Sequence, residues 1–293
     1  MQAYSRVFDF VEVNSTFYGY PSSEMVRSWR TRVRMGFEFG VRCHRDLTHK
    51  YLLEPRDESY QVLKRMLSIC SLLKAETLIL QTPATLEFTN SRMDAIRTFL
   101  QSADTGHVQL VWEIRRPSTL DYPPSLSGLM KDVGIVHCVD ISRHEKSITK
   151  SDLLNTRLFG LGNQNVYQYT DEELTNIHRV AIDSNFRKAV LSFHGIRMYK
   201  DASRLKFFEQ TGRFPMVTQS IGLQSLGEVL AEDVMLPATK RELVTQQGWK
   251  VVDITATNRV KTSELLRHLD NGTYYSIEQN WRCLEESTQS ETC

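Results

Sequence analysis

Short apolar runs alternate along this chain with longer segments whose apolar residues recur at helical spacing. The apolar runs predict seven strands, at residues 8–13, 37–42, 76–81, 109–114, 135–140, 156–162 and 188–194. The amphipathic segments predict helices at residues 23–34, 60–73, 91–100, 124–131, 171–184 and 201–210. Regular alternation of strand and helix is typical of an α/β protein with a parallel sheet, and it argues against an all-β fold or a helix bundle.

Polar and charged side chains recur at the carboxyl ends of these predicted strands. They are Glu12, Asn14, Arg42, His44, Gln81, Glu113, Arg115, Asp140, Arg157 and His194. In a barrel such strand ends converge on one mouth, whereas in an open sheet they spread along an edge. We therefore predict a TIM-like (β/α) barrel, although seven strands are one fewer than that fold uses. A doubly wound open sheet is the alternative.

The strand–helix pattern changes after about residue 221. Thr239 is positioned to cap a helix over residues 240–247, and Thr262 begins another that ends near Leu269. We predict a barrel domain over residues 1–221 and a small, mainly helical domain over residues 222–293. The second segment has the size of a winged or helix-turn-helix module, but it contains more acidic than basic residues. This charge favours docking of a protein partner over DNA binding.

Composition sets weak limits on function. The net charge of +1 gives no overall basic field that would attract nucleic acid. The five cysteines are odd in number and form no C-x-x-C pair, which is typical of reduced core residues and predicts a cytoplasmic protein. No apolar run is long enough to span a membrane, so we expect no membrane association.

The segment VEVNSTFY at residues 11–18 resembles the signature of the YecE-like family, known as domain of unknown function seventy-two. Further similar segments follow in the family's order: FEFGVRCHRDLTH, WEIRRPS, TRLFGLGN, the Y-T-D-E-E-L run from Tyr169, and LSFHGIRMYKDASRL. Arg116, Phe159, His194 and Gly195 replace a histidine, a histidine and two asparagines of the family pattern.

The resemblance covers roughly residues 1–215 and implies a TIM barrel. Family members usually begin with a further strand and a glycine-containing loop, which we do not find before Phe8. We expect either that the start was assigned too late or that another segment fills the place of that strand. The biochemistry of the family is poorly defined, so the resemblance implies a fold more firmly than a function.

Carboxylates and imidazoles at the predicted mouth are candidates for catalysis. We expect Glu12, Glu113, His49 and His194 to do acid–base work, and with Asp140 and His44 they could hold a divalent metal that activates water. No close ligand spacing such as H-x-x-x-H is present, so the metal and any other cofactor stay open. The alternative is that Glu12 and Glu113 form a structural ion-pair network with Arg42, Arg115 or Arg157.

Several arginines at the same strand ends are suited to an anion. Guanidinium groups recognise phosphate or carboxylate bidentately, and Arg42, Arg115, Arg116 and Arg157 outnumber what the acids there require. We expect Asn14, Thr16, Tyr18, Arg42, Arg115, Arg157 and Tyr169 to bind the ligand.

Two functions follow from these candidates. One is a hydrolase, such as a phosphodiesterase, acting on a phosphorylated or nucleic-acid substrate. The alternative is a non-catalytic protein that binds an anionic ligand or nucleic acid and docks a partner through its C-terminal domain. No dinucleotide, P-loop or serine-hydrolase motif is present.

Overall fold

The structure is a computed structural model that describes residues 1–115, 121–183 and 185–278. It consists of two compact units, which are described separately. The first comprises Met1–Arg157 and Ala181–Ser192, and the second comprises Leu158–Val180 and Phe193–Cys293. Within the described residues, no helix combines the length and the apolar character that a membrane crossing requires.

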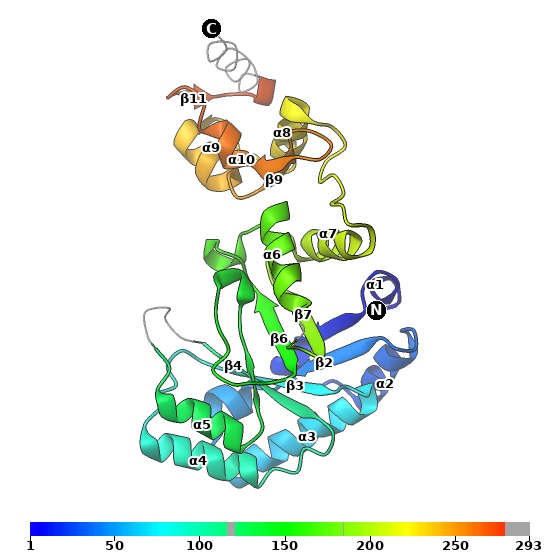
Figure 1. The fold of residues 1–293 in the computed structure, drawn as a ribbon, viewed down its shortest axis with the longest axis vertical. Coiled ribbons are helices and arrows are strands. Elements are labelled where there is room, and N and C mark those ends of the chain that lie inside the picture. Colours follow the sequence, from blue (N-terminus) through cyan, green and yellow to red (C-terminus); the bar gives the residue numbers. More distant parts are fainter. Residues whose placement is uncertain (116–120, 184, 279–293) are drawn as a thin grey trace. The chain divides into compact units, whose positions relative to one another are not determined.

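A parallel sheet forms the centre of the first unit (Figure 1). Its strands are β1 (Phe10–Val13), β2 (Glu38–Arg42), β3 (Thr77–Thr82), β4 (Gln109–Ile114) and β5 (Val136–Cys138), and they pair in sequence order. A parallel bridge between Val139 and Thr156 leads from β5 to β6 (Leu153–Leu158), which pairs with β7 (Lys188–Phe193). Consecutive order without reversal is that of a TIM-like α/β fold, whereas a doubly wound sheet needs a switch point.

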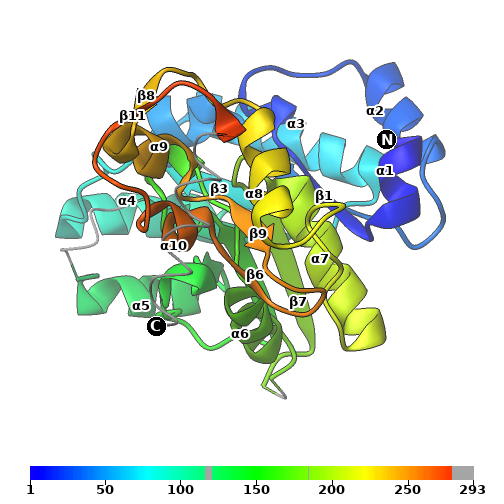
Figure 2. The same ribbon diagram turned by 90° about the horizontal axis from the view of Figure 1, so that it is seen from above.

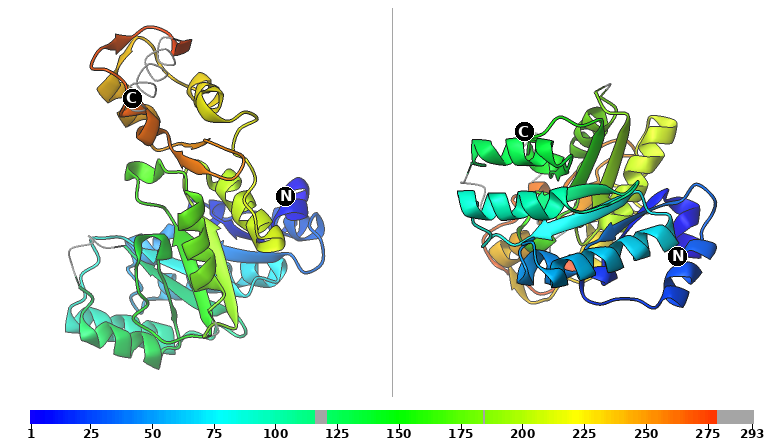
Figure 3. Two further views of the ribbon diagram at one scale, coloured as in Figure 1. Left: turned by 45° about the horizontal axis from the view of Figure 1, so that its top comes forward. Right: turned by 90° about the horizontal axis from the view of Figure 1, so that it is seen from below.

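Both faces of this sheet are covered, which explains why its strands lack polar alternation. In β3, Leu78 and Leu80 pack in the large outer core with the helices, whereas Ile79 packs with Val111 and Val136 on the other face. The helices of this unit are α1 (Gln2–Val7), α2 (Ser23–Thr31), α3 (Asp57–Leu73), α4 (Asn90–Gln101) and α5 (Pro124–Asp132). Figure 3 shows α3, α4 and α5 along one side of the sheet.

The predicted elements of the first unit are confirmed with small shifts at their ends. Ser22 caps α2 by accepting a hydrogen bond from the Met25 amide at 3.2 Å. β6 begins three residues before the predicted start at Thr156, and it ends before Gly160, whose φ of +74° turns the chain. Such a φ is easily adopted only by glycine, so the turn is fixed by sequence.

The second unit is built from helices and two short strand pairs (Figure 2). The helices are α6 (Asp171–Ala181), α7 (Met198–Thr211), α8 (Gly222–Ala231), α9 (Lys240–Gln247) and α10 (Thr262–Leu266). β8 (Ala238–Thr239) pairs with β11 (Thr273–Tyr274), and β9 (Val251–Asp253) pairs with β10 (Arg259–Lys261), both antiparallel. The prediction of α9 and its cap at Thr239 is confirmed, but α8 and the strand pairs were not predicted.

Candidate functional site

Polar side chains of the first unit meet at the carboxyl ends of its parallel strands. Glu12 in β1 lies opposite Gly40 in β2, and Gln81 in β3 lies opposite Glu113 in β4. Because parallel strands end at the same edge, this register carries residues from distant parts of the sequence to one place. The strand register therefore brings together the side chains that we predicted at one mouth: Glu12, Arg42, Gln81, Glu113 and Arg157.

Arg157 in β6 joins two carboxylates. Its Nε atom lies 3.1 Å from Glu12 Oε2, and its Nη1 atom pairs with Glu113 Oε2. The Arg157 side chain is only 2% exposed. The other carboxylate oxygen of Glu113 lies 3.3 Å from Nε of Arg115. The ion-pair network expected as the alternative to catalysis is thus present, and it offsets the cost of burying these charges.

Arg42 at the end of β2 is a buried cation without a carboxylate partner among the described residues. Its Nη2 atom donates to Gln81 Oε1, and its Nη1 atom lies 3.4 Å from Asn14 Oδ1. The guanidinium carbon is 3.9 Å from the ring centroid of Phe17, and the buried Nε atom makes no hydrogen bond. Burial and the charge of Arg157 lower the pKa of Arg42 to about 10, so it remains charged at neutral pH.

Phe17 also supports the neighbouring rings. It lies at the end of the 3-10 helix Ser15–Phe17, and its ring makes edge contacts with Tyr18 at 5.0 Å and His49 at 5.1 Å between centroids. Burial, followed by the charges of Arg42 and Arg115, lowers the pKa of His49, which keeps this imidazole neutral at neutral pH. Its Nδ1 atom lies 2.9 Å from the Thr48 hydroxyl.

Thr16 has a structural place in this site. Its hydroxyl lies 2.8 Å from the Val13 carbonyl oxygen and 2.6 Å from the Arg42 carbonyl oxygen. It therefore ties the short helix after β1 to the end of β2, and this contact positions Phe17 beneath Arg42. Thr16 is fully buried, so its hydroxyl serves the backbone instead of a ligand.

The predicted metal ligands do not come together. No group of three or more His, Cys, Asp or Glu side chains in the described part of the chain is arranged to hold a metal ion. Glu12 and Glu113 bind Arg157 instead, and His44 stacks on Tyr20 with 4.2 Å between ring centroids. Asp140 caps a local turn, because its Oδ1 atom accepts the Ser142 amide at 3.0 Å.

Two predicted site residues belong to the second unit. His194 stacks on Phe159, with 5.1 Å between ring centroids. Tyr169 is 1% exposed, and its ring contacts Tyr167 and Phe193, so its side chain packs inside the second unit and its role in ligand binding stays a prediction. Arg116 lies outside the described residues.

Sequence reasoning missed the roles of Phe17 and Gln81. Gln81 was visible as a polar residue at a strand end, but only the structure shows that it orients Arg42. Phe17 follows the strand in a run of aromatic residues, and nothing in that run indicates that its ring would lie under a guanidinium from another strand.

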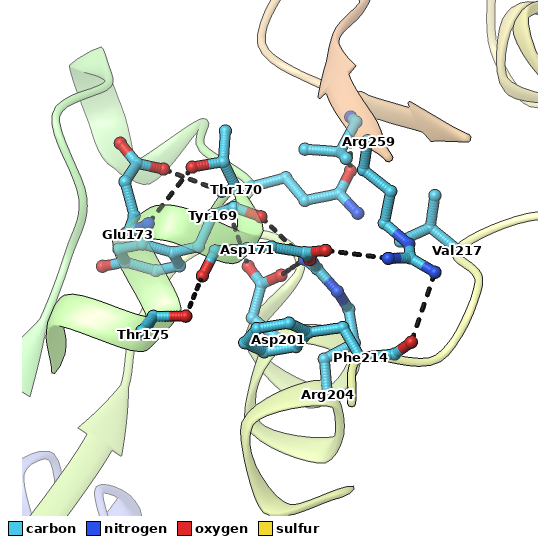
Figure 4. A network of polar contacts seen from close by, with 12 residues as sticks. Tyr169, Thr170, Asp171, Glu173, Thr175, Asp201, Arg204, Phe214, Val217 and Arg259 are labelled. Carbon is cyan, nitrogen blue, oxygen red and sulfur yellow. Dashed lines mark hydrogen bonds and ion pairs between the residues drawn. The ribbon is translucent and has the colours of Figure 1, made fainter. Parts of the chain in front are cut away.

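A second polar cluster lies within the second unit (Figure 4). Asp171, the first residue of α6, binds Arg204 of α7 at 2.6 Å and Arg259 of β10 at 2.8 Å. Asp201 and Asp253 are buried partners of the same two arginines, at 2.9 and 2.8 Å. These pairs connect α6, α7 and β10 and account for the burial of two arginines.

Comparison with known proteins gives a family and a fold. The model of the family described as protein of unknown function DUF72 matches residues 1–206. The crystal structure of a DUF72 family protein from Enterococcus faecalis V583 is similar, with a TM-score of 0.56, 15% identity, and coverage of 71% of this chain and 91% of that one. A DUF72 family protein from Thermotoga maritima MSB8 has a TM-score of 0.56, 18% identity, and coverage of 69% and 85%. No curated protein matches the sequence.

Proposed function

Since the chain belongs to the DUF72 family, which is of unknown function, we propose from the site alone that it binds an anionic ligand at the carboxyl ends of β1, β2, β4 and β6. The buried guanidinium of Arg42 carries this proposal. Among the described residues no carboxylate forms an ion pair with it, although the charge of Glu12 acts on it from a longer distance, and its Nε donor is unused. A buried charge is costly unless it is paired. A bound anion would supply the negatively charged partner that the Arg42 guanidinium lacks.

The balance of charge at the site supports the same conclusion. Three guanidinium groups, of Arg42, Arg115 and Arg157, share two carboxylates, of Glu12 and Glu113. The charge of Arg157 opposes that of Arg42, and the pKa of the neighbouring His49 is lowered by burial, Arg42 and Arg115. Among these five described side chains positive charge is in excess, and an anion would relieve the repulsion among the arginines.

The arginines are held in fixed positions before any ligand arrives. Gln81 and the Phe17 ring restrain Arg42, and Glu113 restrains both Arg115 and Arg157. Restraint of long side chains reduces the conformational entropy that binding would otherwise remove. Planar guanidinium groups recognise the oxygens of phosphate or carboxylate through paired hydrogen bonds.

The test compares thermal unfolding and calorimetric binding in phosphate and in chloride at equal ionic strength. We expect phosphate to raise the Tm of the wild type and Arg42→Gln to weaken phosphate binding about 10- to 100-fold, since a hydrogen bond to a charged group is lost. Arg27→Gln removes the same charge from an exposed position on α2 and should leave the response intact. An equal response in both variants, or none in the wild type, would refute the proposal.

A further inference from the structure

Tyr18 presents an open aromatic surface beside the arginines. Its side chain is 68% exposed, and its hydroxyl makes no hydrogen bond within the part of the chain that the structure describes. The ring meets Phe17 edge-on, at an interplanar angle of 84°. The centroid of the same Phe17 ring lies 5.0 Å from the centroid of the Tyr18 ring and 3.9 Å from the guanidinium carbon of Arg42, so it places Tyr18 near this arginine.

Tyr20, two residues further along the chain, has both faces of its ring occupied by other side chains of the protein. His44 stacks on it at 4.2 Å with an interplanar angle of 12°, and the guanidinium carbon of Arg65 lies 3.9 Å from the ring centroid. Two groups at such distances occupy opposite faces of the ring. Among the described residues, the only ring contact of Tyr18 is the edge contact with Phe17, so a flat ligand group can still stack on it.

The charge of the site selects among phosphate esters. The three arginines exceed the two carboxylates by one positive charge. A phosphodiester has a single negative charge. A phosphate monoester, such as a phosphorylated side chain, has a charge of about −1.5 to −2 at neutral pH. The excess charge therefore matches a diester better than a monoester.

Arginines and an exposed aromatic ring together are the elements by which proteins hold single-stranded nucleic acid, because the cations follow the backbone and the bases stack on the rings. We propose that the site binds a single-stranded oligonucleotide, with one phosphodiester on Arg42 and Arg115 and an adjacent base stacked on Tyr18. This inference rests on the proposed anion binding and specifies its ligand.

The experiment measures binding of a short, fluorescently labelled deoxythymidine oligonucleotide to the full chain. We expect Tyr18→Ala to weaken binding about 5- to 150-fold, the range that loss of one base stack produces, while Tyr18→Trp retains it. Tyr275→Ala is the matched control, because Tyr275 is 70% exposed and lies in the second unit. An abasic strand should bind wild type and Tyr18→Ala equally.

Duplex binding and the phosphate response of the variants distinguish base stacking on Tyr18 from anion binding by the arginines. A duplex should bind more weakly than the single strand, since paired bases cannot stack on Tyr18. If duplex and single strand bind equally, or if Tyr18→Ala binds the oligonucleotide as the wild type does, the stacking inference is wrong. The phosphate response should be unchanged in Tyr18→Ala and weakened about 10- to 100-fold in Arg42→Gln. If that response is absent from the wild type, anion binding itself fails.

Discussion

Arg157 in β6 and Glu12 in β1 lie far apart in the sequence, yet their side chains meet with 3.1 Å between Nε and Oε2. Both are buried, so water screens the pair little. Arg157 holds Glu113 as well, and the three residues connect β1, β4 and β6. The same contact that stabilises the fold thereby fixes the charge around the candidate site.

The first prediction concerns this pair. Arg157→Met removes the buried cation shared by Glu12 and Glu113 and leaves Glu113 with Arg115 alone, so we expect a loss of about 3–5 kcal/mol in the free energy of unfolding, measured by urea denaturation. Arg187→Met is the control, because Arg187 pairs with Asp152 at 2.9 Å on the exposed surface, where a pair contributes about 1 kcal/mol or less. Equal losses in the two variants would contradict a stabilising role of the buried network.

A second prediction concerns the turn after β6. A Cβ atom on Gly160 would lie 2.3 Å from Cδ1 of Tyr167, and the φ of +74° is unfavourable for other residues. Gly106 has a φ of +56° but open space around it, so Gly106→Ala isolates the backbone strain, at about 1–2 kcal/mol. We expect Gly160→Ala to cost about 1–3 kcal/mol more, because the Tyr167 ring must also move. If Gly160→Ala and Gly106→Ala lower the unfolding free energy equally, the Tyr167 ring moves aside without cost and the prediction is wrong.

Much of the fold could be predicted from sequence because its strands are short, apolar and bounded by clear breaks. The strand over residues 109–114 was predicted with the bounds that the structure gives to β4, and Thr239 was predicted as the cap that begins α9. The register of parallel strands then brings their ends together without further information. This is why Glu12, Arg42, Glu113 and Arg157 could be placed in one site before the structure was known.

The contacts within the site could not be predicted in the same way. Which acid binds Arg157, and which ring lies under Arg42, depends on the closing geometry of strands that are distant in sequence. Asp140 occupied a strand end like the others, yet its carboxylate caps the local turn at Ser142. Tyr169 begins a family-like segment, but its side chain is buried in the second unit. A strand-end position therefore predicts proximity but not the role of a side chain.

The third prediction uses the acid in the second unit's ion-pair cluster. Burial raises the pKa of Asp201 from 3.8 to about 6, although Arg204 at 2.9 Å and the Tyr169 amide at 3.2 Å favour the charged form. Between about pH 4 and pH 6 the folded state therefore binds more protons than the unfolded state, so this group's contribution to stability falls as pH rises. In urea denaturation, Asp201→Asn should gain up to about 3 kcal/mol relative to wild type across that window, whereas the exposed Asp94→Asn should show no such change. A constant difference between wild type and Asp201→Asn at all pH values would show that folding does not raise the pKa of Asp201.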